Sequence, residues 1–200
     1  MIKNEILKLF PDPILKYKLD DYKILNKDLE KYIYNLYEED TQGIQKSNKG
    51  GWHSKNFNLS EQNSIQTKFA IEVQKYILDC FQNMGWKTQD KNIRITEMWA
   101  IINKKESFNV VHTHPNCYLS SAYYVKASKN CGAFIAENPN VAKRYAFPEI
   151  MNKNQYNSET AGIEIEEGDL LLFPSYLPHK VSKNESDDDR IVISFNVDIK

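Results

Sequence analysis

The sequence predicts a mainly β fold with flanking helices: a double-stranded β-helix, or jelly roll, with N-terminal helices packed on one sheet. Two observations predict this fold. From about residue 93 onwards, apolar and polar residues alternate in short segments that turn-forming residues separate. Before residue 90, apolar residues recur at helical spacing instead. Helices followed by a run of strands favour a jelly roll with helices outside one sheet.

The length of the chain predicts one domain. Its 200 residues, 41% of them hydrophobic, are enough to bury a core of ordinary size. We expect a single domain over residues 1–200. Residues 1–90 are expected to form a helical N-terminal elaboration, and residues 91–200 the double-stranded β-helix core.

Two helices are expected in the N-terminal part. The first covers residues 25–37, where apolar residues recur every three or four positions. The second is expected to have Ser60 as its N-cap and to end near Met84. Between them, residues 41–58 are rich in Gly, Asn and Lys and are predicted to form a loop.

Six strands are expected in the C-terminal part, because each of these segments alternates or is continuously apolar between turn signals. They cover residues 94–102, 119–125, 132–136, 162–166, 169–173 and 191–197. The long connection at 141–158 is predicted to be a lid or binding loop, since structureless connections of this length are often functional.

Charge and cysteine content limit the classes of function and location. The formal net charge is -1, so a general nucleic-acid or membrane-surface binder is not expected. The three cysteines are widely spaced and include no CxxC pair, which indicates a reducing compartment. No signal peptide and no apolar run of about 18 residues is recognised. We therefore expect a cytoplasmic protein without a membrane anchor.

Histidines provide the candidate metal site. His112 and His114 are two residues apart, so on a strand they would lie on the same face, about 6–7 Å apart. His179, far along the chain, could complete a set of three ligands that leaves positions open on a non-haem iron. The alternative is a pair of polar histidines without a ligand role. His53 is expected to be a surface histidine of the 41–58 loop, with a place over a cavity mouth as the alternative.

Arg190 provides the candidate anion site. If it opens the last strand, Arg190 and Ser194 lie on one face, and a guanidinium with a hydroxyl suits a bound carboxylate. The alternative is an exposed arginine that pairs with the acidic segment 185–189.

These residues lie within several motifs that occur in a recognisable order. They are Trp99-Ala-Ile-Ile-Asn103, Phe108-Asn-Val-Val-His112-Thr-His114-Pro-Asn116, Leu119-Ser-Ser-Ala-Tyr-Tyr124-Val, Gly132-Ala-Phe-Ile-Ala-Glu137-Asn-Pro139 and the segment from His179 to Asn196. Over residues 93–200 the chain resembles the Fe(II)/2-oxoglutarate-dependent oxygenase superfamily, and within it the 2OG-Fe(II) oxygenase branch of bacteria and phages.

The resemblance implies a dioxygenase that uses Fe(II), 2-oxoglutarate and O₂ to oxidise a small-molecule or peptide substrate, with release of succinate and CO₂. It implies that His112 and His179 are iron ligands. Arg190 would pair with the far carboxylate of 2-oxoglutarate, and Ser194 and Tyr124 would assist it. Tyr123, on the opposite face of its strand, is the rival of Tyr124.

The sequence departs from the superfamily at the second ligand. The common pattern is His-x-Asp or His-x-Glu, whereas this chain has His114. Three interpretations stay open: a three-histidine site, Asn116 at the carboxylate position, or Glu137 from another strand. We favour His112, His114 and His179 because their spacing supports that set directly.

Two other functions are consistent with the sequence. One is a cupin-type three-histidine dioxygenase that uses no 2-oxoglutarate, although Arg190 would then have no role. The other is a non-catalytic jelly-roll binding module, because a fold by itself does not guarantee activity. The substrate is not predicted; its specificity is expected in the loops 41–58 and 141–158. The apolar helical faces could support a homodimer.

Overall fold

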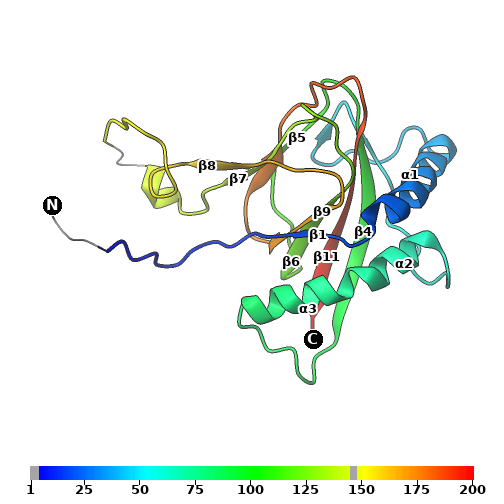
Figure 1. Ribbon diagram of the computed structural model, residues 1–200, viewed down its shortest axis with the longest axis horizontal. Coiled ribbons are helices and arrows are strands. Elements are labelled where there is room, and N and C mark those ends of the chain that lie inside the picture. Colours follow the sequence, from blue (N-terminus) through cyan, green and yellow to red (C-terminus); the bar gives the residue numbers. More distant parts are fainter. Residues whose placement is uncertain (1–4, 145–147) are drawn as a thin grey trace.

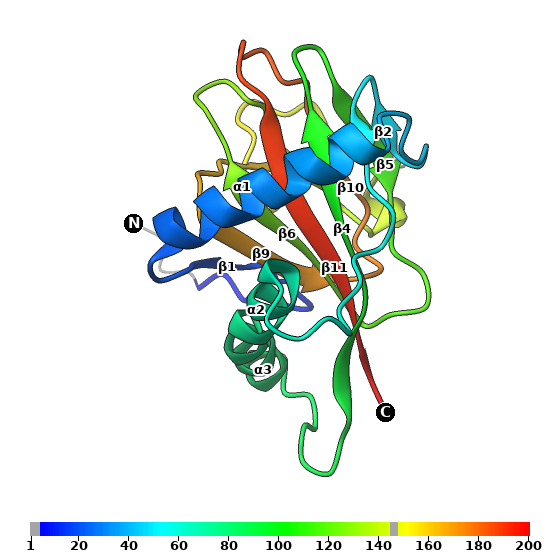
Figure 2. The ribbon, with the colours of Figure 1, turned by 90° about the vertical axis from the view of Figure 1, so that its right-hand side faces the viewer.

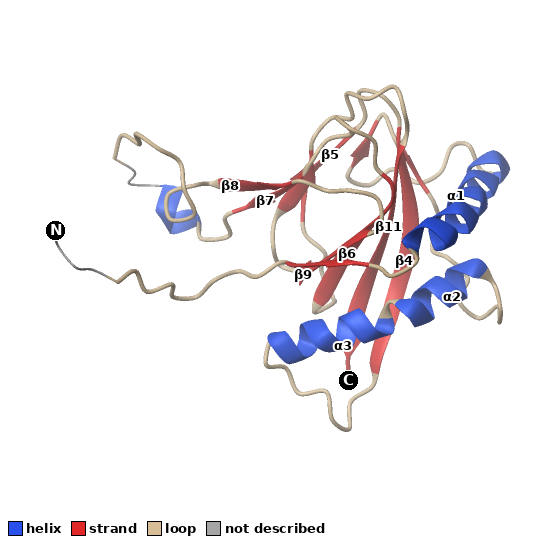
Figure 3. Ribbon diagram, in the orientation of Figure 1, coloured by secondary structure: helices blue, strands red, loops and turns tan. Residues whose placement is uncertain are grey.

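Two antiparallel sheets face each other and form the body of the protein (Figures 1 and 3). The computed structural model describes residues 5–144 and 148–200. The larger sheet has the order β1-β9-β6-β11-β4-β3, and the smaller has the order β2-β5-β10-β7-β8. The helices α1 (Tyr22–Glu39), α2 (Ile65–Glu72) and α3 (Gln74–Asn83) lie on the outer face of the larger sheet (Figure 2). This is the predicted double-stranded β-helix with N-terminal helices packed on one sheet.

The strands of the two sheets have the following bounds. In the larger sheet they are β1 (Leu15–Lys18), β9 (Asp169–Pro174), β6 (Leu119–Lys126), β11 (Arg190–Ile199), β4 (Ile93–Asn103) and β3 (Trp52–His53). In the smaller sheet they are β2 (Asn48–Lys49), β5 (Phe108–His112), β10 (His179–Val181), β7 (Phe134–Glu137) and β8 (Thr160–Ile163).

All six expected strands are present, as β4, β6, β7, β8, β9 and β11, with β8 beginning two residues earlier than expected. Five further strands were not predicted: β1, β2, β3, β5 and β10. They have two to five residues each, and β2, β3 and β10, with two or three residues, are too short to display a period of two. Three of them, β1 to β3, come from the segment before residue 90, which therefore contributes to both sheets as well as forming helices.

The helices differ in detail from the prediction. Helix α1 (Tyr22–Glu39) is longer than expected. The second expected helix is two helices, α2 (Ile65–Glu72) and α3 (Gln74–Asn83), which meet at Val73. Ser60 is not their N-cap, because its backbone N–H and its hydroxyl are bonded to Asn58 in a turn. The cap is Ser64, whose hydroxyl accepts a hydrogen bond from the backbone N–H of Thr67 at 3.4 Å.

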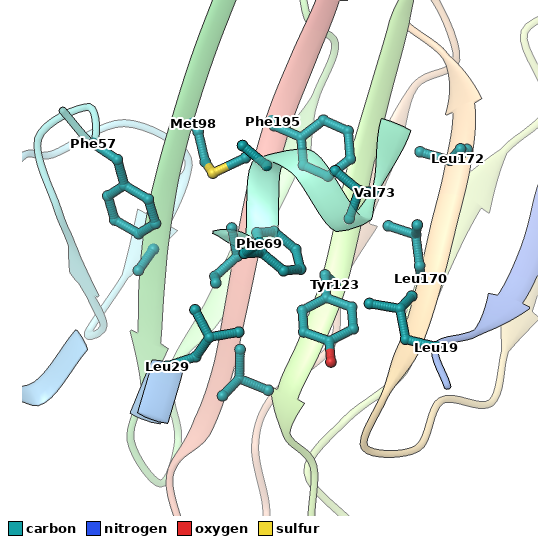
Figure 4. Packing of buried hydrophobic residues seen from close by; sticks show 14 of the residues in the cluster. Leu19, Leu29, Phe57, Phe69, Val73, Met98, Tyr123, Leu170, Leu172 and Phe195 are labelled. Carbon is teal, nitrogen blue, oxygen red and sulfur yellow. The ribbon is translucent and has the colours of Figure 1, made fainter. Parts of the chain in front are cut away.

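Apolar side chains form two clusters, one on each face of the larger sheet. The outer cluster lies between this sheet and the helices, where Phe69 packs on Tyr123 with ring centroids 4.8 Å apart (Figure 4). The inner cluster lies between the two sheets and includes Tyr124, Phe134 and Phe173. Consecutive side chains of a strand point to opposite faces, so Tyr123 and Tyr124 belong to different clusters. The tyrosine that faces the interior of the sandwich is Tyr124.

Among the described residues, no helix has the length and apolar character that crossing a bilayer requires.

Candidate active site

A cavity of about 630 Å³ opens between the two sheets. Its walls come from the inner face of the larger sheet and from β5, β7 and β10 of the smaller one. The predicted site residues that line it are His112, His114, His179, Arg190, Ser194, Tyr124 and Asn116. The cavity therefore brings together side chains that are far apart in the sequence.

Three histidines meet in this cavity and form a group that could hold a metal ion. One ring nitrogen of each of His112, His114 and His179 lies within 4.8 Å of the others. His112 ends β5 and His179 begins β10, and the two residues are direct partners across these strands. His114 lies beyond the end of β5, where its backbone N–H donates to the carbonyl of Ser175 at 3.0 Å. The expectation that both histidines lie on one strand is therefore wrong in detail, since His114 lies in the irregular segment that follows β5 and not on the strand itself.

Each ring is fixed through its Nδ1 atom. Nδ1 lies 2.8 Å from the Val110 carbonyl in His112 and 2.9 Å from the Leu177 carbonyl in His179. In His114 it lies 3.0 Å from Oδ1 of the Asn196 side chain. These oxygens only accept hydrogen bonds, so the proton of each ring resides on Nδ1. Nε2 then keeps its lone pair for a metal, which is the usual support of a histidine ligand.

Burial keeps these histidines neutral. Burial, together with repulsion from His112, lowers the pKa of His179 to about 3 and that of His114 to about 4. The pKa of His112 is also lowered, mainly by burial. Neutral imidazoles are the form that binds metals, so the protein holds the three rings ready at neutral pH.

The two alternative ligands lie in different environments. Glu137 pairs with Lys180 at 3.1 Å, does not line the cavity and is not part of the histidine group. It follows Ala136, which packs between the sheets, so its side chain starts from the opposite face of β7. Asn116 lines the cavity from the turn that follows His114.

Arg190 is fully buried with half of its guanidinium unpaired. Nη1 donates to the carbonyls of Cys131 and Ser182, whereas Nε and Nη2 have no partner among the described residues. The expected alternative, pairing with the acidic segment 185–189, is wrong. Within the described part of the chain, that segment contacts other groups instead: Asp187 pairs with Lys105, and Asp189 accepts a hydrogen bond from Tyr34.

Tyr124 and Ser194 line the same cavity as Arg190. Tyr124 lies on β6 opposite Val192, and the positive charge of Arg190 partly opposes the increase in its pKa that burial causes. Tyr123 is on the other side of the sheet, where its hydroxyl donates to Oδ1 of Asn26 at 2.6 Å.

The expectation that His53 lies on the surface is wrong, because His53 is buried and lines the cavity, which agrees with the alternative of a place at the cavity. The short strand β3, which contains His53, pairs with β4. This pairing brings the imidazole of His53 nearly parallel to the ring of Trp99, with the two ring centroids 5.6 Å apart. Trp99 is stacked in turn on His114, at 5.8 Å. The contact depends on the pairing of β3 with β4, which the composition of the 41–58 loop does not indicate.

Among the described residues, the two predicted specificity loops differ in whether they line the cavity. From the 41–58 loop, Lys46, Ser47 and His53 line it. No described residue of 141–158 does so, and three residues of that connection, 145–147, lie outside the described residues. Figure 1 shows β8 and the η1 helix (Val141–Arg144) extending away from the body of the sandwich.

A comparison with protein-family models finds one match, described as "Putative 2OG-Fe(II) oxygenase", over residues 97–196. This match covers half of the chain and includes all three clustered histidines and Arg190. The chain belongs to this oxygenase family.

Solved structures share the fold of the oxygenase. One is HygX from Streptomyces hygroscopicus with nickel, 2-oxoglutarate and hygromycin B bound. Its TM-score is 0.65 at 11% sequence identity, and the alignment covers 94% of this chain and 83% of the HygX chain. A prolyl-4-hydroxylase from Pseudomonas putida has a TM-score of 0.64 at 12% identity, with 92% of each chain covered. The carbocyclase SnoK from nogalamycin biosynthesis has a TM-score of 0.65 at 10% identity and covers 93% of this chain and 79% of its own. No curated protein matches the sequence significantly.

The oxygenase uses Fe(II) and 2-oxoglutarate, and its cavity has groups that suit both. Three neutral imidazoles with free Nε2 atoms suit a divalent transition metal. A buried guanidinium with two unpaired nitrogens suits a carboxylate.

Proposed function

We propose that the oxygenase hydroxylates a small molecule or a peptidyl side chain and releases succinate and CO₂. His112, His114 and His179 hold Fe(II) through their Nε2 atoms. Arg190 binds the far carboxylate of 2-oxoglutarate, with Tyr124 and Ser194 beside it. The observation that carries this proposal is the unpaired half of the Arg190 guanidinium, buried in the cavity that contains the histidines.

A buried charge without a partner is strongly unfavourable, so its presence in a cavity indicates an anionic ligand. Two parallel N–H groups of a guanidinium match the two oxygens of a carboxylate. Nη1 is already occupied by backbone carbonyls and fixes the plane of the group. Nε and Nη2 therefore keep one orientation in which to receive the ligand.

Bound Fe(II) and 2-oxoglutarate supply the oxidative chemistry, in which O₂ oxidises the keto acid to succinate and CO₂ and the substrate to its alcohol. The protein contributes the position and surroundings of the reactants. Phe134, Phe173 and Val192 form apolar walls that exclude water from the cavity. No general base is needed for this reaction.

The substrate is proposed to contact the 41–58 loop, because Lys46, Ser47 and His53 are its cavity-lining residues. The prolyl-4-hydroxylase among the structural neighbours supports hydroxylation as the reaction. The carbocyclase among them is an oxygenase-fold protein named for a different reaction, so hydroxylation needs its own test. Both peptidyl and small-molecule substrates occur among these neighbours: a prolyl hydroxylase on one side, and HygX with bound hygromycin B on the other.

We also propose that residues 1–200 act as one oxygenase domain, because strands from the segment 1–90 complete both sheets. A cytoplasmic location is consistent with the free state of Cys80, Cys117 and Cys131.

An anaerobic titration with Fe(II) and then 2-oxoglutarate tests the proposal through the charge-transfer absorption of the ternary complex. Wild type is expected to develop the band, and Arg190→Ala and the milder Arg190→Lys to require at least 10-fold more 2-oxoglutarate. Arg94→Ala, at an exposed arginine on β4, is the matched control.

Each other outcome would overturn a different part of the proposal. Bound iron without a band would favour a three-histidine dioxygenase that uses no 2-oxoglutarate. Absence of bound iron in wild type would favour a non-catalytic binding module. Succinate release that rises with a substrate would support oxygenation, and mass spectrometry of the product, with a gain of one oxygen atom, would identify hydroxylation.

A further inference from the structure

His114 differs from the other two histidines in the group that fixes its ring. His112 and His179 are each held by a backbone carbonyl two residues earlier in the chain. His114 is held by a side chain 82 positions away, that of Asn196. His114 is also the residue that replaces the acidic ligand of the common His-x-Asp or His-x-Glu pattern.

Asn196 belongs to a row of polar side chains that crosses three strands. In the register of the larger sheet, Asn196 on β11 lies opposite Glu97 on β4 and opposite Ser120 on β6. Its Oδ1 accepts hydrogen bonds from Ser120 Oγ at 2.9 Å and from His114 Nδ1 at 3.0 Å. Its Nδ2 donates to Glu97 Oε2 at 3.0 Å. Every polar atom of the amide therefore has a partner in the row or at the metal site.

The carboxylate at the end of this row determines the orientation of every group before it. A carboxylate only accepts hydrogen bonds, so Glu97 requires the NH₂ of Asn196 to face it. The carbonyl oxygen of Asn196 must then face His114, and His114 must carry its proton on Nδ1. Nε2 is thereby left with its lone pair toward the metal position. Without Glu97, the amide could rotate and the tautomer of His114 would no longer be set.

Glu97 has no competing role among the described residues. It is the sole acidic side chain in the cavity wall, and it forms no ion pair in the described part of the chain. Asn196 and Ser120 are buried, with 5% and 0% of their surface exposed, so water does not readily replace their contacts. In such surroundings a hydrogen bond to a charged group is stronger than in water.

We propose that Glu97 and Asn196 are positioning residues for the metal, and that they act through His114. Glu97 supplies, through the amide of Asn196, part of the negative charge that an acidic ligand would supply directly. The row makes Nε2 of His114 a better donor and fixes its direction. This inference rests on the proposed role of His114 as a ligand.

Titration of the metal-free protein with Co(II) tests the inference, because the ligand-field absorption of Co(II) reports on its ligands without any turnover. Asn196→Leu, which removes the acceptor, is expected to weaken Co(II) binding by about 10- to 100-fold, the usual effect of losing such a support. Glu97→Gln is expected to weaken it less, by several-fold, since a glutamine can offer either an acceptor or a donor to Asn196.

The decisive variant exchanges the two functional groups. In Asn196→Asp/Glu97→Gln, the new carboxylate accepts from His114 and Ser120, and the new amide donates to it. This double variant is expected to bind Co(II) at least as tightly as wild type and to keep its absorption spectrum. Asn63→Asp/Glu106→Gln makes the same two changes at exposed positions and is the matched control.

Two results would overturn the inference while wild type still binds Co(II). One is binding within twofold of wild type in both Asn196→Leu and Glu97→Gln. The other is a double variant that folds but binds as weakly as Asn196→Leu. Failure of wild type to bind Co(II) would instead contradict the proposed metal site itself, so the two failures are distinguishable.

Discussion

Gly132 packs directly against the guanidinium of Arg190. A Cβ atom at position 132 would lie 2.6 Å from Nη1 of Arg190, 2.6 Å from the carbonyl oxygen of Lys183 and 2.5 Å from that of Ser182. The backbone of Gly132 also has a φ of +90°, which other residues rarely adopt. Because position 132 carries no side chain, the guanidinium of Arg190, which we propose binds 2-oxoglutarate, can occupy this place.

We expect Gly132→Ala to weaken 2-oxoglutarate binding more than metal binding, because the added methyl group displaces the guanidinium. Backbone strain and overlap should also lower the free energy of unfolding by about 1–3 kcal/mol. Separate titrations with Co(II) and 2-oxoglutarate measure the first effect, and denaturant unfolding the second. Gly85→Ala is the control, since Gly85 has a φ of +67° but nothing within 4 Å of its Cβ position. Equal 2-oxoglutarate affinity in the two variants would contradict the prediction.

Tyr123 and Tyr124 provide a matched pair with opposite expectations. Tyr124→Phe should raise the Kd for 2-oxoglutarate several-fold, because Tyr124 lies beside Arg190 in the cavity. Tyr123→Phe should leave that Kd unchanged and lower the free energy of unfolding by about 1 kcal/mol, through the lost bond to Asn26. The same titration and unfolding measurements apply to both. If Tyr123→Phe changed the Kd for 2-oxoglutarate and Tyr124→Phe did not, the assignment of Tyr124 to the co-substrate would be wrong.

The ligand set is tested by removing one candidate at a time. His179→Ala and His114→Ala should each weaken Co(II) or Fe(II) binding by at least 100-fold, since each removes a ligand atom of the group. Glu137→Gln should bind the metal as wild type does, because Glu137 lies away from the cavity wall. Calorimetric titration measures these affinities. Loss of binding in Glu137→Gln, with His114→Ala unaffected, would restore the carboxylate alternative.

The stability of the metal-free protein should decrease as the pH falls from about 6.5 to about 4. A histidine in the unfolded chain has a pKa near 6.5, whereas the pKa of folded His179 is about 3 and that of His114 about 4. In this window the unfolded chain binds more protons, so acid favours unfolding, and each such histidine contributes about 1.4 kcal/mol per pH unit. Well above pH 6.5 these histidines are neutral in both the folded and the unfolded state, so their contribution to the free energy of unfolding no longer changes with pH.

His179→Gln should reduce that slope by about one proton. Urea unfolding at a series of pH values measures it, with metal removed by a chelator. Identical slopes in wild type and variant would mean that His179 is not held neutral by the fold. Gln82→Ala, an exchange of an uncharged residue at an exposed position of α3, controls for general effects of a substitution on the unfolding midpoint.

The sequence by itself determined the class of fold and predicted several side chains that line the cavity, among them His112, His179 and Arg190. The alternation in β4 and β11 and the continuous apolar run of β9 are local properties of the sequence, which do not depend on what each strand pairs with. The spacing of His112 and His114, together with the motif that contains His179 and Arg190, was equally local. The helical spacing of residues 25–37 and 60–84 correctly predicted helices there. The choice of Ser60 as the N-cap was wrong, because Ser60 and Ser64 are the same residue type and only their surroundings determine which one caps the helix.

The tertiary structure decided everything that depends on pairing between distant segments. The strand pattern placed Tyr123 and Tyr124 on opposite faces, but only the helices packed against Tyr123 established which face is outside. The pairing of β3 with β4 places His53 in the cavity wall, whereas the loop-like composition of residues 41–58 had predicted that His53 lies on the surface. The row from Glu97 through Asn196 to His114 exists only in one register of three strands, because a shift by one residue would turn these side chains to the opposite face. Register is set by the packing of the whole sheet, and no local pattern specifies it.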